Sequence, residues 1–178
     1  THELEKRFNE AALALDNKSA STAAETRSLL QAVYVDDDQF RADFEVFRQT
    51  TSSKGKKVIR YILCELERQN TSQDLNWSTA TATIEHLLPE NLDDHWASIF
   101  SEDEHLRYVD RLGNFALLEF GKNKELGQKS FTDKRTVLET SQYSLTKDIA
   151  AFEEWTPATI SERQRNLARL ATSVWRFP

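Results

Sequence analysis

Two short segments in the middle of the chain have the pattern of β-strands, whereas the sequence on both sides of them has the spacing of α-helices. The first is TATATIEH, residues 79–86, in which β-branched residues recur in alternation. The second is GNFALLEF, residues 113–120. A chain with so little strand and so much helix is predicted to be mainly α with a small β-hairpin.

Helical periodicity dominates the first seventy residues. Apolar residues recur three or four positions apart in residues 4–15, and residues 56–69, KKVIRYILCELERQ, have one wide apolar face. TAAE, residues 22–25, has the form of a capping box. Residues 1–70 are therefore predicted to be a helical bundle or linker without chemistry of its own, and residues 71–178 a second domain with both strands.

The sequence after the second strand is predicted to return to helix. GKNKELGQ, residues 121–128, is predicted to be a loop that leads into a helix from about Ser130 to Thr140. The last stretch is predicted to be helical, because Pro157 suits a first turn and apolar residues follow at helical spacing.

Composition excludes several classes of protein. Cys64 is the single cysteine, which excludes an internal disulfide framework and a cysteine-rich zinc site, and it favours a reducing, cytoplasmic setting. No apolar run approaches the roughly 20 residues that span a bilayer, so no membrane partner is expected. The chain begins at Thr1 without methionine or a secretory signal, which favours a fragment of a longer protein.

Charge is unevenly distributed along the chain. The net charge of -6 counts against a protein that coats nucleic acid through bulk electrostatics. Residues 121–135 nevertheless carry five basic and two acidic residues, whereas every charged residue in 87–106 is acidic. The basic segment is either a solvated helix face or a surface for phosphate groups.

Four polar residues stand at special places around the two strands. Glu85 and His86 end the first strand, Asn114 opens the second, and Asn123 follows in the loop. Hydrolysis of a phosphodiester needs a base to activate water and a divalent cation to stabilise charge on the phosphate. A carboxylate and an amide oxygen suit Mg²⁺ rather than Zn²⁺, and a neutral imidazole is a suitable base near pH 7.

Four motifs in this order resemble a known nuclease domain. They are IEHLLP, RLGNFALL, KNKELGQKSFTDKR and ISERQRNLA. Together they resemble the C-terminal domain of GmrSD-type restriction enzymes and of SspE-type phosphorothioation-dependent defence proteins. The resemblance covers roughly residues 56–175 and implies an HNH, or His-Me finger, nuclease with a ββα-metal core embedded in a helical domain.

The resemblance assigns a role to each of the four polar residues. It implies that His86 is the general base and that Glu85 and Asn123 bind a single Mg²⁺ or Mn²⁺ ion. Asn114 becomes the middle residue that ties the loop to the second strand and helps to fix the base. DNA-backbone contacts are implied for the basic residues of the loop and the following helix, which are Lys122, Lys124, Lys129 and Lys134. The acidic segment is then expected to lie away from DNA.

The resemblance also implies an activity and partners. The expected activity is nicking or double-strand cleavage of phage or other foreign DNA, as the effector of a prokaryotic anti-phage restriction system. The expected second partner is an N-terminal domain of the same full-length protein, of a kind that often binds or hydrolyses nucleotide.

Structural alternatives remain open at each of these positions. Glu85 and His86 can be an exposed pair at a strand end, Asn114 a turn former, and Asn123 a helix cap or loop residue. The corresponding alternative function is a catalytically weak DNA-binding or interaction module coupled to the N-terminal domain.

Overall fold

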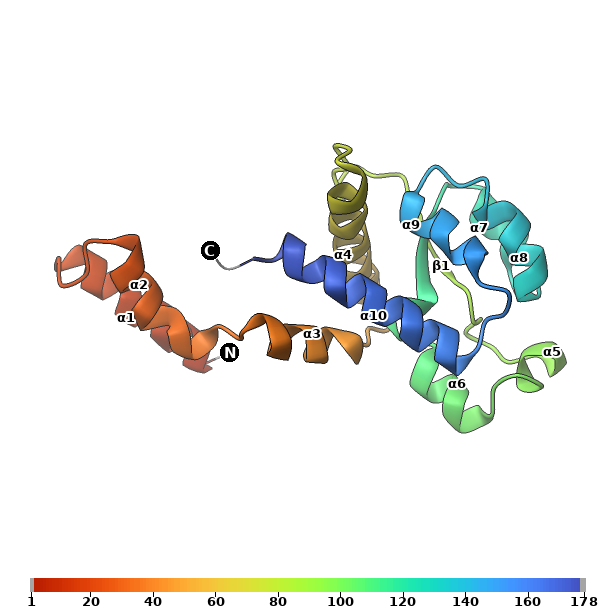
Figure 1. The fold of residues 1–178 in the computed structure, drawn as a ribbon, viewed down its shortest axis with the longest axis horizontal. Helices are drawn as coiled ribbons and strands as arrows, with labels where there is room; N and C mark the ends of the chain where they lie inside the picture. The colour runs from red at the N-terminus through yellow and green to blue at the C-terminus, as the bar shows by residue number, and fades with distance from the viewer. Residues whose placement is uncertain (1, 177–178) are drawn as a thin grey trace. The chain divides into compact units, whose positions relative to one another are not determined.

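The computed structural model describes residues 2–176 (Figure 1). Contacts between residues divide the chain into two compact units, Thr1–Phe40 and Arg41–Pro178. None of the helices within residues 2–176 is both long and apolar enough to cross a membrane.

The first unit is built from helices. It contains α1 (His2–Asp16), α2 (Ala23–Leu30) and a 3-10 turn, η1 (Gln31–Val33), while α3 (Asp37–Glu45) begins in this unit and ends in the second. The predicted capping box at the start of α2 is confirmed. The Thr22 hydroxyl accepts a hydrogen bond from the Glu25 N–H at 3.2 Å, and the Glu25 carboxylate accepts one from the Thr22 N–H at 3.0 Å.

The second unit carries the two strands among helices. In chain order it contains α4 (Ser53–Thr71), β1 (Thr83–His86), α5 (Asp94–Ala97), α6 (Glu102–Tyr108), η2 (Leu112–Asn114), β2 (Phe115–Leu118), α7 (Lys122–Leu126), α8 (Phe131–Leu138), α9 (Ser144–Lys147), η3 (Asp148–Ala151) and α10 (Pro157–Val174). The long helix α10 packs across α4 and also contacts η2 and α6 (Figure 1). Pro157 occupies the first turn of α10, as predicted.

The two strands form an antiparallel sheet. Glu85 lies opposite Ala116, and His86 lies opposite Phe115. All four residues of β2 are buried, which explains why FALL is an unbroken apolar run rather than an alternating one. The predicted fold class, mainly α with a small two-stranded β-structure, is confirmed.

Large aromatic side chains form the core beside this sheet. Trp96, Phe100 and Trp155 are almost completely buried, and the Trp155 ring stacks on Phe131 with their centroids 5.1 Å apart. Phe131 begins α8 and Trp155 precedes α10. The core therefore joins α8 to the start of α10, and it gives the polar residues near β1 a rigid support.

Helix α4 belongs to the second unit, although the sequence pattern assigns it to a helical part that ends at residue 70. Ile59, Leu63 and Leu66 are buried, and α4 packs against β1, β2 and α10. The division of the chain thus falls after Phe40. The apolar face of α4 requires a partner, and the sheet and α10 supply it.

The segment 121–128 differs from the loop that the sequence predicts. Its central residues form the short helix α7, and Gly121 and Gly127 flank it with φ angles of 107° and 47°. Glycine adopts positive φ at little cost, so the two glycines delimit a helical turn rather than mark a loop. The next helix is confirmed as α8, with Ser130 as its N-cap.

Candidate active site

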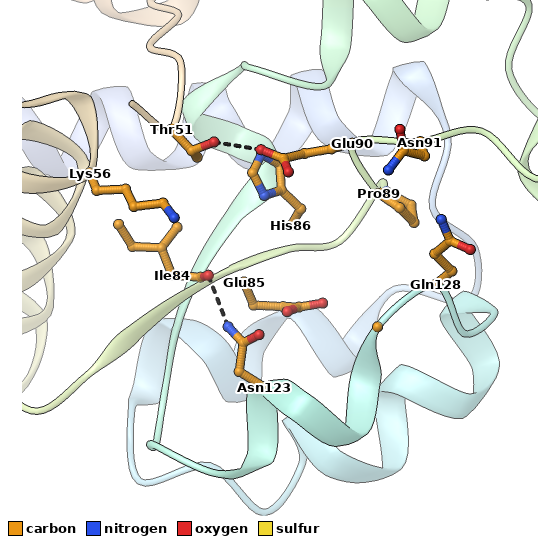
Figure 2. A pocket seen from close by; sticks show the side chains of 11 residues that line it. Thr51, Lys56, Ile84, Glu85, His86, Pro89, Glu90, Asn91, Asn123 and Gln128 are labelled. Atoms are coloured by element: carbon orange, nitrogen blue, oxygen red, sulfur yellow. Dashed lines mark hydrogen bonds and ion pairs between the residues drawn. The ribbon is translucent and has the colours of Figure 1, made fainter. Parts of the chain in front are cut away.

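A pocket of about 300 Å³ opens beside β1 (Figure 2). It brings together Glu85, His86 and Asn123, three of the four residues that the sequence singles out. The complete lining is Thr51, Lys56, Ile84, Glu85, His86, Pro89, Glu90, Asn91, Asn123, Gly127 and Gln128. The pocket is therefore built by the loop before α4, by α4 itself, by β1 with its following loop, and by α7 with the turn after it.

His86 presents an unpaired ring nitrogen in this pocket. Its side chain is only 13% exposed, and the Phe115 ring lies against it edge-on with the ring centroids 4.7 Å apart. The Nε2 atom is buried and has no hydrogen-bond partner among residues 2–176. The nearest carboxylate is that of Glu90, with Oε1 3.8 Å from Nε2. This distance exceeds a hydrogen bond.

Burial also sets the charge state of His86. Loss of hydration lowers the pKa of the imidazole below its usual value, and the carboxylates of Glu90 and Asp110 oppose that shift only in part. Lys134 and Lys56 act in the same direction as burial. The ring is consequently neutral near pH 7 and able to accept a proton.

Asn114 lies outside the pocket and holds the loop that follows His86. Its Nδ2 donates to the carbonyl oxygens of Leu88 and Val109, both at 2.9 Å. Its Oδ1 accepts from the Leu88 N–H at 2.7 Å and from Trp155 Nε1 at 3.0 Å. The amide thus uses both donors and two acceptor positions, and the residue is completely buried. These hydrogen bonds hold the loop, and Asn114 does not line the pocket.

Glu85 is paired with a lysine in the protein interior. The Lys134 Nζ donates to Glu85 Oε1 at 2.7 Å, to the His86 carbonyl oxygen at 2.7 Å and to the Leu87 carbonyl oxygen at 3.1 Å. Burial raises the pKa of Glu85, and the charge of Lys134 opposes this shift. Burial likewise lowers the pKa of Lys134, which Glu85 opposes. The pair attaches the end of β1 to α8.

The prediction that Lys134 contacts DNA is wrong. Its side chain is 0% exposed, and its three ammonium donors are used by Glu85 and two backbone carbonyl groups. The helix face that carries it also carries the buried Phe131 and Leu138, and Glu85 supplies the counter-charge that a buried lysine requires.

The three other lysines lie in different environments. The Lys122 Nζ donates to the Glu119 carboxylate at 2.9 Å and to the Thr140 carbonyl oxygen at 2.8 Å. Lys124 and Lys129 are exposed. Of the four lysines, only Lys124 and Lys129 are exposed and have a side chain that makes no hydrogen bond within residues 2–176.

Asn123 reaches the pocket from α7. Its Nδ2 donates to the Ile84 carbonyl oxygen at 2.9 Å, which ties α7 to β1. Figure 2 shows the amide oxygen on the side of Glu85, away from Ile84. The hydrogen bond therefore orients Asn123 with an oxygen directed toward the carboxylate.

The oxygens of Glu85 and Asn123 fit a hard divalent cation. No cluster of three or more histidine, cysteine or acidic side chains suited to a metal ion occurs in the described part of the chain. A site with one carboxylate and one amide leaves the remaining positions to water and phosphate, which is the usual arrangement for Mg²⁺. A zinc site needs three or four protein ligands and does not fit this donor set.

Other pocket residues come from places that the sequence analysis did not single out. The Thr51 hydroxyl donates to Glu90 at 2.5 Å, and Lys56 extends from α4 toward Ile84 (Figure 2). Glu90 opens the acidic segment that was expected to lie away from DNA, yet it lies at the pocket. Thr51 and Lys56, which line the pocket, belong to the part before residue 70 that the sequence predicts to be a bundle or linker. The available signal for Glu90 was its place in the short segment that follows His86.

The model of the family "GmrSD restriction endonucleases, C-terminal domain" matches residues 34–170. The chain belongs to this family. The matched region contains all the pocket residues together with Asn114 and Lys134. A search of curated proteins found no match for this GmrSD-family domain. Restriction endonucleases are nucleases that act on DNA, so the GmrSD-family domain is a member of a DNA-acting nuclease family.

Proposed function

We propose that this GmrSD-family domain is an HNH-type DNA endonuclease or nickase that uses Mg²⁺ or Mn²⁺, with His86 as the general base. The observation that carries the proposal is the buried Nε2 of His86, which has no hydrogen-bond partner in residues 2–176 and lies in one pocket with Glu85 and Asn123. An unpaired buried nitrogen is unfavourable, so a ligand that pairs with it explains its presence. The attacking water is that ligand.

The arrangement of elements around the pocket supports a ββα-metal core. His86 and Glu85 lie on β1, β2 pairs with β1, and Asn123 lies on the helix that follows β2. The Asn123 hydrogen bond to Ile84 keeps that helix against β1. The proposed base and the proposed metal ligands are thereby held in fixed positions relative to one another.

The proposed reaction is hydrolysis of a phosphodiester. Glu85 and Asn123 would hold a divalent cation, which would supply positive charge to stabilise the negative charge that develops on the phosphate. The Nε2 atom of neutral His86 accepts a proton from water while the water oxygen forms a bond to phosphorus. The bond between phosphorus and the departing sugar oxygen breaks, and that oxygen keeps the electron pair and takes a proton from solvent.

Two buried residues support this chemistry without touching the substrate. Asn114 holds Leu88 at both its N–H and its carbonyl group, two residues after the base. Lys134 holds the carbonyl oxygens of His86 and Leu87. The backbone from His86 to Leu88 is thus fixed, which limits the orientations from which the ring can accept a proton.

In the cell, we propose that the domain acts in the cytoplasm as the effector of a prokaryotic anti-phage restriction system. Its partners are foreign DNA and an N-terminal domain of the same full-length protein. Membership in the restriction endonuclease family supports this role.

A second candidate function is a catalytically weak DNA-binding or interaction module coupled to that N-terminal domain. The observation in its favour is that few basic side chains are available to contact the DNA backbone. The net charge is -6, Lys134 is buried, and Lys122 is paired with Glu119. In this alternative the pocket binds DNA or transmits a signal without cutting.

Plasmid cleavage distinguishes the two functions. Supercoiled plasmid is incubated with the purified protein and Mg²⁺, Mn²⁺, Zn²⁺ or a chelator, and nicked and linear products are quantified. The matched variants are His86→Ala and His95→Ala, because His95 is exposed and lies outside the pocket. The nuclease proposal expects cleavage with Mg²⁺ or Mn²⁺ that is lost in the first variant and kept in the second. Equal cleavage by both variants would exclude His86 as the base, and no cleavage by the parent would favour the binding module.

A further inference from the structure

A second pocket of about 330 Å³ adjoins the candidate active site. Lys56, Ile84 and Asn123 line both pockets, so the two are continuous along one side of β1. The second pocket extends from there to Arg60 on α4 and to Phe120 and Lys124 around the start of α7. Its size is at the lower end of the range for small-ligand sites, about 300–1,000 Å³.

The charged residues described in the lining of this second pocket are all basic. Lys56, Arg60 and Lys124 line it, and the described residues of its lining include no acidic side chain. No hydrogen bond or salt bridge within residues 2–176 occupies any of the three side chains, and the Arg60 Nε is buried without a partner. In a protein with a net charge of -6, three unneutralised cations around one hollow form a local site for an anion.

An exposed aromatic ring lies beside these cations. The Phe120 side chain is 76% exposed, two residues after the end of the buried strand β2. Gly121 follows with a φ of 107°, and a Cβ atom at that position would have no neighbour within 4 Å. The ring therefore projects from an open turn at the edge of the pocket. Exposed aromatic rings next to Lys and Arg are the usual means by which proteins bind unpaired bases.

We propose that this second pocket binds an unpaired nucleotide next to the phosphodiester in the candidate active site. The base stacks on Phe120, and its flanking phosphates contact Arg60 and Lys124. Lys56 contacts the phosphate at the junction of the two pockets. The statement that the scissile phosphodiester lies next to this nucleotide rests on the proposed nuclease function. Binding of single-stranded DNA at this pocket does not depend on that function.

The binding part is tested without cleavage. Fluorescence anisotropy measures the affinity of the whole chain, in a chelator, for a labelled single-stranded oligonucleotide and for a blunt duplex of the same sequence. Phe120→Ala is expected to weaken single-strand binding by about 5- to 150-fold, the range for loss of one stacked base, and to change duplex binding much less. The matched control is Leu106→Ala, because Leu106 is 65% exposed and lines neither pocket.

The charge contacts are tested by the dependence of binding on salt. Arg60→Ala and Lys124→Ala should each reduce the slope of log affinity against log salt by about 0.7 for a single strand. Lys147→Ala is the control, because Lys147 is exposed and lies outside both pockets, and it should leave the slope unchanged. Circular dichroism of every variant verifies that the fold is retained.

The outcomes separate the subsite from the nuclease function. If Phe120→Ala binds single strands as the parent does, or loses single-strand and duplex affinity equally, the subsite proposal is overturned whether or not plasmid is cut. If Phe120→Ala loses single-strand affinity selectively and the parent does not cut plasmid, the subsite stands and the nuclease proposal fails. Selective loss together with cleavage by the parent supports both.

Discussion

Lys134 and Glu85 form an ion pair inside the protein, with Nζ and Oε1 2.7 Å apart and with side-chain exposures of 0% and 6%. The same ammonium group also holds two carbonyl groups of the chain around His86. The pair therefore joins α8 to β1, and it links the stability of the core to the geometry of the candidate active site.

Removal of the lysine should be costly. Lys134→Met leaves the Glu85 carboxylate buried without its counter-charge, and loss of one partner of a buried pair costs about 3–5 kcal/mol. Denaturant unfolding should show this loss in the free energy of unfolding, while the exposed control Lys147→Met should be nearly neutral. A double variant, Lys134→Met with Glu85→Gln, should be more stable than Lys134→Met alone. Equal stability of the parent and the single variant would show that the pair contributes nothing.

The Lys134→Met variant should also have a characteristic pH dependence. Burial already raises the pKa of Glu85, and removal of the lysine removes the charge that opposes this shift. The folded state then holds the Glu85 proton more tightly than the unfolded state, so stability is present below the unfolded pKa and is lost as the pH rises through the folded pKa. The gap in stability between this variant and the parent should narrow as the pH is lowered toward about 4.3, the usual pKa of glutamate.

Loss of the proposed base should slow the reaction without unfolding the protein. His86→Ala is expected to reduce the rate of strand cleavage by about 10²- to 10⁴-fold, the usual effect of a positioned base. DNA binding in a chelator should change little, because His86 is one lining residue among several. Single-turnover cleavage assays measure the rate, and a parent-like rate would remove His86 from the mechanism.

The pH dependence of the parent provides an independent measure of His86. Its folded pKa is lowered, first by burial, so cleavage should persist below about pH 6.5, the usual pKa of histidine, and decline only as the pH falls through the lower folded value. Below about pH 6.5 the unfolded state binds the proton more readily, so this group lowers the stability as the pH falls. His86→Ala should lack that contribution in pH-dependent unfolding, whereas the exposed control His95→Ala should retain it.

Metal binding should depend on the two proposed ligands. Glu85→Gln and Asn123→Ala should each weaken Mg²⁺ or Mn²⁺ binding in calorimetric titration, because each removes or weakens one oxygen ligand. Asn91→Ala is the control, since Asn91 lines the pocket but is not a proposed ligand. Stability is measured in parallel, because Glu85 is buried and its replacement disturbs the pair with Lys134. Unchanged titrations for both variants would disprove the assignment.

Asn114 should contribute more to stability than its position in a short turn indicates. Asn114→Ala removes four hydrogen bonds and leaves polar groups of Leu88, Val109 and Trp155 buried without this partner. Each such buried group costs about 1–3 kcal/mol, so several kcal/mol are expected in the free energy of unfolding. Asn166→Ala, on the surface of α10, serves as the control. A variant as stable as the parent would show that the loop does not depend on this amide.

Much of the fold and of the candidate site is present in local sequence patterns. The β-branched alternation before His86 and the apolar run after Asn114 predict the two strands, because the pattern of apolar residues in a strand indicates which of its faces are buried. The motif order predicts that Glu85, His86 and Asn123 meet. The pocket brings these three together, because antiparallel pairing of β1 with β2 places the following helix beside β1.

The tertiary structure alone decided which distant side chains complete the site. A lysine on a short helix is predicted to be exposed, since lysine is rarely buried without a partner. Lys134 is buried because Glu85, 49 residues earlier in the chain, supplies that partner. Lys56 reaches the pocket because the apolar face of α4 packs on the sheet. Periodicity shows that a face is buried, but the partner of that face depends on contacts between residues far apart in the chain.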